Sequence, residues 1–346
     1  MIKKLAYRQR RQMWVCICLL SFMVILLSGL ELMWGNTSYS LWEVIQALVH
    51  QDNFAVVKLR LPRVLVGILC GFAFGIAGHS FQTMFRNPLA SPDIMGVSSG
   101  AASFAVFGLL VLHKSGIVIS ILSVMGALFT SFLIYRFANN TDSKLTKMIL
   151  VGLGMQAFLQ ALISYMILKA APNDLSNAMR WLSGSLNHSS MDEVLRLLPI
   201  VVLIGGILMW IQPHVQILKL SKEMAIPLGV NVKRIQMLVF VCAVILAAVA
   251  TSTTGPIASV AFLSGPIAQK ISRQNQNSLP IAGLVGSLIV LLADCISQNV
   301  LPIRYPVGVI TGVLGAPYLI YTLLRLNKKG EEDDAYIACS ATELCL

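Results

Sequence analysis

The residues that could carry catalytic or metal chemistry are few in this sequence, and they are scattered. GVSSG at Gly96–Gly100 matches the hydrolase elbow G-x-S-x-G, but that elbow needs a preceding strand and a soluble sheet. The five histidines lie in separate segments without the paired spacing of metal ligands. No G-x-x-x-x-G-K-[ST] loop for ATP phosphates occurs. We therefore expect no catalytic residue, no cofactor-binding residue and no metal site in this chain, and any ATP and Mg to be bound by a partner.

The composition explains this scarcity. Apolar residues make up 56% of the 346 positions and charged residues only 12%, whereas about a quarter of the residues of a soluble domain are charged. The net charge of +11 comes from basic residues spread between apolar runs, which indicates membrane topology and no binding of nucleic acid. The apolar runs are about 20 residues long, so the expected class is an all-α polytopic membrane protein.

Ten apolar runs could cross a bilayer. With a cytoplasmic N-terminus, 18 of the 26 Lys and Arg residues fall inside and eight outside, as the positive-inside rule requires, and both termini are cytoplasmic. Runs two to five and seven to ten then form two inverted four-helix groups plus two extra helices. The runs are 13–33, 64–83, 97–112, 117–137, 148–168, 195–211, 235–254, 257–271, 281–300 and 307–326.

The second member of each group is short and is flanked by Gly, Pro and other helix breakers. RNPLASPDIMGVSSG precedes the run at 97–112, and TTGP and LSGP bracket the run at 257–271. Matching interrupted segments in two halves point to a translocation path, although close packing of helices through small residues is an equal alternative. The residues expected to line this path are Gln82, Ser98, Ser99 and Ser259.

Five segments at or beyond the ends of the spans also carry information. KLRLPRVL places Lys58, Arg60 and Arg63 at the outer mouth of the second run, in a helical or an extended conformation, where they would meet an acidic partner or anchor to lipid headgroups. The stretches 40–50 and 173–195 are amphipathic and are expected on the outer surface. The basic insertion 218–234 could form a short helix beneath the membrane, to which a soluble, ATP-driven partner would bind. Residues 331–346 form an acidic tail, which we expect to be disordered in the cytoplasm and separate from the membrane domain at 1–330.

Several ordered motifs resemble one known family over residues 40–326, the FecCD-type permeases of ABC importers for iron siderophores, haem and cobalamin. Each motif is weak alone, but their order and spacing are specific. They are LRLPR at 59–63, RNPLASPDIMGVSSGA at 86–101, WLSGSL at 181–186, AIPLGVNVKR at 225–234, TGPIASVAFLSGPIAQKI at 254–271, LLAD at 291–294 and YPVGVITGVLGAPYLIYTLLR at 305–325.

This resemblance implies ten spans per subunit, two permease subunits around a central path, two cytoplasmic ATPase subunits and an extracytoplasmic substrate-binding protein. It implies that the binding protein docks on Arg60, Arg63 and Arg304, and that the ATPase docks on Ala225, Ile226, Pro227, Leu228, Gly229 and Val230. The chain departs from the family at 263–267, where it reads LSGPI, and the acidic tail has no counterpart in the family pattern.

The function that follows is a permease subunit of a binding-protein-dependent ABC importer in the cytoplasmic membrane of a bacterium, without an ATPase site of its own. An iron siderophore is the favoured substrate because it is the commonest in the family, and haem and cobalamin remain alternatives. The pairing of the permease with itself or with a sister chain stays open. A rival from another class is an ion-coupled secondary transporter, for which only Asp294 is a candidate ion-binding residue; its other interpretation is a helix-packing carboxylate.

Overall fold

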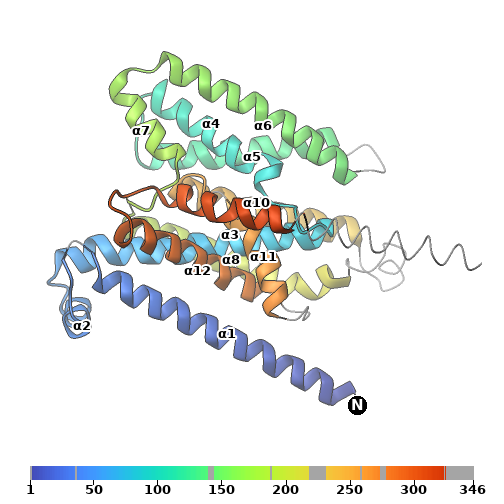
Figure 1. Cartoon of the computed structure of the whole chain (residues 1–346). Coiled ribbons are helices and arrows are strands. Elements are labelled where there is room, and N and C mark those ends of the chain that lie inside the picture. Colours follow the sequence, from blue (N-terminus) through green and yellow to red (C-terminus); the bar gives the residue numbers. More distant parts are fainter. Residues whose placement is uncertain are drawn as a thin grey trace, which may run out of the picture.

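The computed structural model describes residues 2–35, 37–138, 144–187, 189–217, 231–257, 259–272, 278–322 and 324 (Figure 1). All regular structure within these ranges is helical, which confirms the expected all-α class. The helices in chain order are α1 (Ile2–Met33), α2 (Leu41–His50), α3 (Leu61–Phe85), α4 (Val97–Leu110), α5 (Ile117–Ala138), α6 (Lys144–Lys169), α7 (Pro172–Leu182), α8 (Met191–Ile217), α10 (Val232–Thr254), α11 (Val260–Ile271), α12 (Leu279–Asn299) and a C-terminal helix (Val307–Thr322).

Each of the ten apolar runs overlaps one of these helices. Most ends differ by a few residues, but α1 begins at Ile2, well before the run at 13–33, and the end of the run at 307–326 lies outside the described residues. Seven of the helices in the described part are long and apolar enough to cross a membrane. The helices α4 and Val307–Thr322 are apolar but shorter, and α11 has only 12 residues. The chain is therefore a polytopic membrane protein whose short helices include the two that the breakers predicted.

Helix α3 forms the centre of the bundle. It contacts α8, α10, α11 and α12, while α1 lies along one edge and α4 to α7 lie on the other side (Figure 1). In its most apolar window 78% of the residues of the α3 span are buried, compared with 11% in α1. Alpha-helix α1 therefore presents most of its apolar surface to lipid, and α3 presents its surface to other helices.

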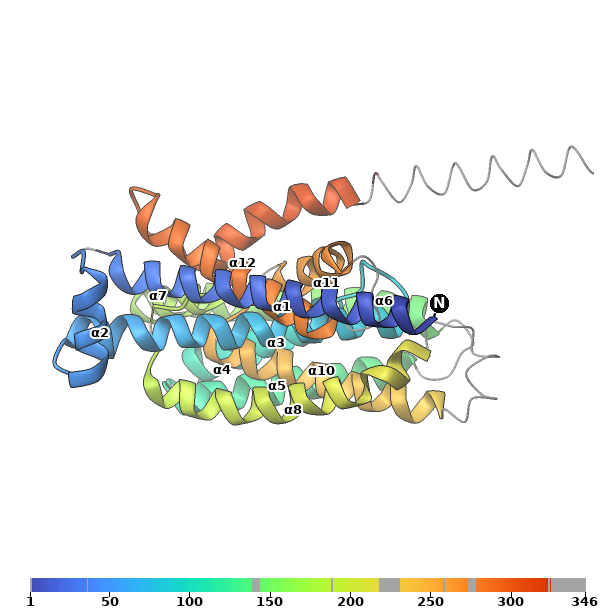
Figure 2. The ribbon, with the colours of Figure 1, turned by 90° about the horizontal axis from the view of Figure 1, so that it is seen from below.

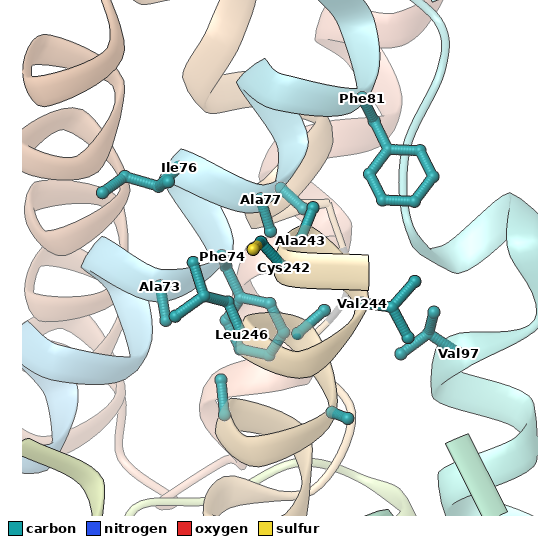
Figure 3. Close-up of a cluster of buried hydrophobic side chains, with 14 of the residues drawn as sticks. Ala73, Phe74, Ile76, Ala77, Phe81, Val97, Cys242, Ala243, Val244 and Leu246 are labelled. Carbon is teal, nitrogen blue, oxygen red and sulfur yellow. The ribbon is translucent and has the colours of Figure 1, made fainter. Parts of the chain in front are cut away.

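Small residues let α3 approach its neighbours closely. A Cβ atom added at Gly75 would lie 2.2 Å from the carbonyl oxygen of Ala282 in α12, so the two backbones touch there. Larger side chains fill the remaining space on the other face, where Phe74 and Phe81 of α3 pack against α10, and Val97 of α4 lies beside Val244 of α10 (Figure 3). Packing of this kind drives helix association where lipid offers no hydrophobic gain.

Two short amphipathic helices lie at the end of the bundle opposite the N-terminus, which we call the α2 end (Figures 1 and 2). Helix α2 matches the stretch expected at 40–50, with Ser40 as its N-cap in a capping box with Glu43. The stretch expected at 173–195 is not one helix. It divides into α7, which ends at Leu182, and the first turn of α8, with a Gly184 turn of φ 67° between them.

Candidate functional site

Arg63 and Asp294 form a buried ion pair between α3 and α12. Arg63 Nε donates to Asp294 Oδ2 at 2.7 Å, and Arg63 Nη2 donates to Oδ1 at 2.6 Å. The Asp294 side chain is 0% exposed and that of Arg63 is 16% exposed. Two further side chains complete the arrangement, because Arg63 Nη1 donates to Asn187 Oδ1 at 2.6 Å and Gln298 Nε2 donates to Asp294 Oδ2 at 2.7 Å. A bidentate pair of this kind is strong and fixes the relative orientation of its two helices.

A second carboxylate lies beside this pair. Glu31 of α1 is 5% exposed and interacts electrostatically with both Arg63 and Asp294. Neither of its carboxylate oxygens has a hydrogen-bond partner within the described residues. Glu31 is absent from the candidates drawn from the sequence, although a lone carboxylate inside the apolar run 13–33 is the kind of signal that marks an intramembrane site. We call Glu31, Arg63, Asn187, Asp294 and Gln298 the Arg63 cluster.

The predicted docking arginines have different surroundings. The segment Ala55–Arg60 is a π-helix that continues directly into α3, so the helical alternative for KLRLPRVL is the observed one. Arg60 donates to Leu32 O at 2.8 Å and to Thr37 O at 2.6 Å, and it stacks 5.1 Å from the Tyr39 ring centroid. Arg60 thus holds the α1–α2 turn and Arg63 holds α12, whereas Arg304 lies exposed in the connection after α12.

Gln82, one of the predicted path residues, supports a proline break in α11. A proline inside a helix removes the amide that would bond the carbonyl four residues earlier. For Pro266 that carbonyl belongs to Phe262, and Gln82 Nε2 of α3 donates to Phe262 O at 2.9 Å. Gln82 therefore replaces the missing helical hydrogen bond from a neighbouring helix, as irregular backbone at membrane depth requires.

The three predicted path serines lie at the starts of the two short helices. Ser98 Oγ donates to Asp93 Oδ1, and Ser99 Oγ donates to Gly96 O at 3.3 Å, so both stabilise the turn into α4. Burial raises the pKa of Asp93, and the hydrogen bond from Ser98 opposes this shift. Ser259 is the N-cap of α11. The four path candidates thus form two groups, with Gln82 and Ser259 at α11 and Ser98 and Ser99 at α4.

A small polar cavity between α3, α8 and α12 was not expected from the sequence. Its volume is about 20 Å³, which is room for about one water molecule. His79 and Thr83 of α3 line it together with Gln212 of α8, and Ser278 Oγ lies 2.8 Å from His79 Nε2. His79, read as an isolated histidine in the sequence, therefore belongs to a polar contact between helices beside a cavity with room for about one water molecule. This cavity is too small for an iron chelate.

Two predicted regions lie outside the described residues. They are the ATPase-docking segment, Ala225 to Val230, and the acidic tail at 331–346. The basic insertion is described only from Asn231, whose side chain caps α10 by accepting from Arg234 N at 3.2 Å.

Comparison with known proteins extends over almost the whole chain. It is 33% identical to the ferric enterobactin transport system permease protein FepG of Escherichia coli over 332 residues, which cover 93% of this chain and 99% of that protein. It is 30% identical to the Fe(3+)-citrate import system permease protein YfmE of Bacillus subtilis over 328 residues, covering 93% and 98%.

A solved structure has the same fold. It is a metal-chelate type ABC transporter in an inward-facing conformation, with a TM-score of 0.79, 24% identity, and coverage of 89% of this chain and 98% of that one. The model of the FecCD transport family matches residues 19–325, which include the Arg63 cluster, both short helices and Gln82. This chain belongs to the FecCD transport family.

Proposed function

We propose that this chain is the permease subunit of a binding-protein-dependent ABC importer that carries iron–siderophore complexes across the cytoplasmic membrane of a bacterium. The observation that carries the proposal is the near full-length similarity to permease proteins whose names specify ferric enterobactin and Fe(3+)-citrate. ATP is hydrolysed by separate subunits, in keeping with the lack of a Walker sequence in the chain. Haem and cobalamin are the alternative substrates.

The proposed assembly contains two permease subunits, either identical or sister chains, with two ATPase subunits and one extracytoplasmic binding protein. Each permease crosses the membrane ten times with both termini in the cytoplasm, and the α2 end faces outward. The segment Ala225–Val230 docks the ATPase, and the tail at 331–346 stays separate in the cytoplasm. Gln82, Ser98, Ser99 and Ser259 line or adjoin the path, because they lie at the two interrupted helices.

The environment of Asp294 argues against Asp294 as the coupling-ion site of the rival secondary transporter. A coupling-ion site needs a carboxylate that is available to the ion. Asp294 already accepts two hydrogen bonds from Arg63 and one from Gln298. Its role in this proposal is to hold α3 against α12, which agrees with the helix-packing interpretation.

The test is uptake by the reconstituted transporter. The chain, its cognate ATPase and its binding protein are placed in proteoliposomes with ATP inside, and uptake of radiolabelled ferric enterobactin, ferric citrate, haem and cobalamin is measured. We expect uptake of a ferric siderophore that requires ATP and the binding protein. Uptake driven by an ion gradient without the ATPase would refute the importer, whereas ATP-dependent uptake of haem or cobalamin alone would refute only the substrate.

The docking surface is proposed to centre on Arg304, with Arg60 and Arg63 shaping the surface around it. An exposed ion pair typically contributes about 0.2–1 kcal/mol, so Arg304→Glu should weaken binding-protein affinity for the nanodisc-embedded transporter by roughly 1.5- to fivefold. The loss should shrink at high ionic strength because salt screens exposed charges. The matched control is Arg180→Glu in α7, an exposed arginine whose Nη2 donates to Ser176. Equal affinity of Arg304→Glu and the parent chain at low salt would place docking elsewhere.

A further inference from the structure

Helix α2 has three distinct faces. Val44 and Ala47 are buried against Val24 and Leu32 of α1 and Val56 of the π-helix. The polar residues Glu43, Gln46 and His50 share a second face. The third face is apolar and exposed, and at 3.6 residues per turn it covers about 120° of the helix. It consists of Leu41 (61% exposed), Trp42 (66%), Ile45 (42%), Leu48 (37%) and Val49 (70%).

The position of α2 identifies what covers this face. Figure 2 shows α2 running across the ends of α1 and α3 instead of along them, so it lies in the plane of the membrane. The apolar surface continues onto residues beside it, since Trp34 at the end of α1 and Phe54 before the π-helix are 52% and 70% exposed. Helix α1 itself is a membrane span with only 11% of its apolar window buried. The exposed face of α2 therefore lies at the end of a membrane span that itself presents apolar side chains outward.

Local contacts fix α2 in this orientation. The capping box gives it a defined start, with Ser40 N donating to Glu43 Oε2 at 2.7 Å. Arg60 bonds Leu32 O and Thr37 O, which holds the turn between α1 and α2. The apolar face therefore cannot turn into the bundle, and in water it would remain an unfavourable exposed patch.

We propose that α2 is an interfacial helix whose Leu41, Trp42, Ile45, Leu48 and Val49 face inserts into the bilayer leaflet at the α2 end. The composition fits, since tryptophan prefers the boundary between headgroups and acyl chains. A helix of this kind lies about 5–10 Å deep at that boundary. Helix α2 then sets the depth of the α1–α2 turn and of the start of α3 in the membrane.

The first test measures the depth of Trp42. The other tryptophans (Trp14, Trp34, Trp181 and Trp210) are replaced by Phe, and the full chain is placed in nanodiscs of phosphatidylcholine and phosphatidylglycerol. Because an interfacial helix lies near the carbonyl region, lipid brominated close to the carbonyls should quench Trp42 about twice as strongly as lipid brominated near the chain end. The matched control carries Trp42→Phe and Gln46→Trp, which moves the fluorophore to the polar face, where aqueous iodide should quench it instead. Iodide quenching of Trp42 without bromolipid quenching would overturn the proposal.

The second test leaves the tryptophans in place. Val49→Cys and Gln46→Cys are compared, one at a time, in nanodiscs with a polar maleimide, and labelling is measured above that of the parent chain. We expect Gln46→Cys to react and Val49→Cys to be protected. Equal labelling of both would show that the apolar face meets water. Protection of Val49→Cys that appears only after the binding protein is added would show that a protein, and not lipid, covers it.

Discussion

The two short helices α4 and α11 begin after similar backbone turns, but they obtain their additional hydrogen bonds from different places. Each follows a residue with a left-handed backbone, Gly96 with φ 67° before α4 and Ser259 with φ 69° before α11. The turn into α4 is stabilised by residues within it, since Ser98 donates to Asp93 and Ser99 to Gly96. Helix α11 instead contains Pro266, and its Phe262 carbonyl accepts a hydrogen bond from the side-chain amide of Gln82 in α3.

This difference shows where an irregular helix in a membrane obtains its missing hydrogen bonds. The irregular start of α4 takes its side-chain hydrogen bonds from within the turn itself, so these bonds do not depend on another helix, although Gly96 packs against Ile134 and Thr130 of α5. Helix α11 depends on another helix, and its position is therefore coupled to that of α3. Where helices move past one another during transport, the Gln82–Phe262 contact is one that would have to be kept or exchanged.

The largest expected effect comes from Gln82→Leu. This change removes the donor to Phe262 O and leaves a buried carbonyl unsatisfied, which costs about 1–3 kcal/mol of unfolding free energy. Pro266→Ala restores the amide that belongs to that carbonyl, so Gln82→Leu should cost much less in the Pro266→Ala background. Thermal unfolding of the four chains in nanodiscs gives the interaction energy as a double-mutant cycle.

Thr83→Val is the matched control for this cycle. Thr83 is the next residue of α3 and is also buried, but its hydroxyl has no hydrogen-bond partner within the described residues. Its replacement should be insensitive to the residue at 266. An equal cost of Gln82→Leu with and without Pro266 would mean that Gln82 does not support the break in α11.

A smaller effect should distinguish the two helix starts. Gly96→Ala places a Cβ atom 2.9 Å from both Ile134 Cδ1 and Thr130 Cγ2 at a left-handed φ, and it should cost about 1–2 kcal/mol. Ser259→Gly removes the left-handed strain of a side-chain-bearing residue and should stabilise the chain by about 0.5 kcal/mol.

The same thermal-unfolding measurement in nanodiscs checks both variants. A decrease in unfolding free energy for Gly96→Ala together with an increase for Ser259→Gly would support a left-handed backbone at both positions. A loss of stability in Ser259→Gly would show instead that the serine side chain contributes contacts that outweigh its backbone strain.

Much of the fold could be predicted because each span carries its own signal. An apolar run of about 20 residues specifies a helix almost without reference to the rest of the chain. The breakers around 97–112 and 257–271 likewise predicted that the helices there would be short, as α4 and α11 are. Packing at small residues could be anticipated in general, but not the particular partner, since Gly75 could have met any neighbouring helix.

The contacts of the site were less predictable because they join residues far apart in sequence. Arg63 stood out in the sequence as a positive charge on the expected outer side, and Asp294 stood out as a carboxylate in an apolar run. Nothing in the local sequence, however, relates two residues that lie 231 positions apart. The pairing of Gln82 with Phe262 was hidden for the same reason, although Pro266 already indicated that some carbonyl in α11 would need a donor. Glu31 could have been found from its charge alone, whereas its neighbours could not.

The Arg63–Asp294 pair also has a consequence for how the protein is made. During synthesis α3 enters the membrane while Asp294, 231 residues later, does not yet exist. At about 5–20 residues per second, Arg63 waits roughly 10–50 s for its partner. Its place in the first turn of α3 is suited to this delay, because an arginine at a helix end can reach the lipid headgroups until α12 arrives. The ion pair thus closes the bundle late, after most of the chain has been inserted.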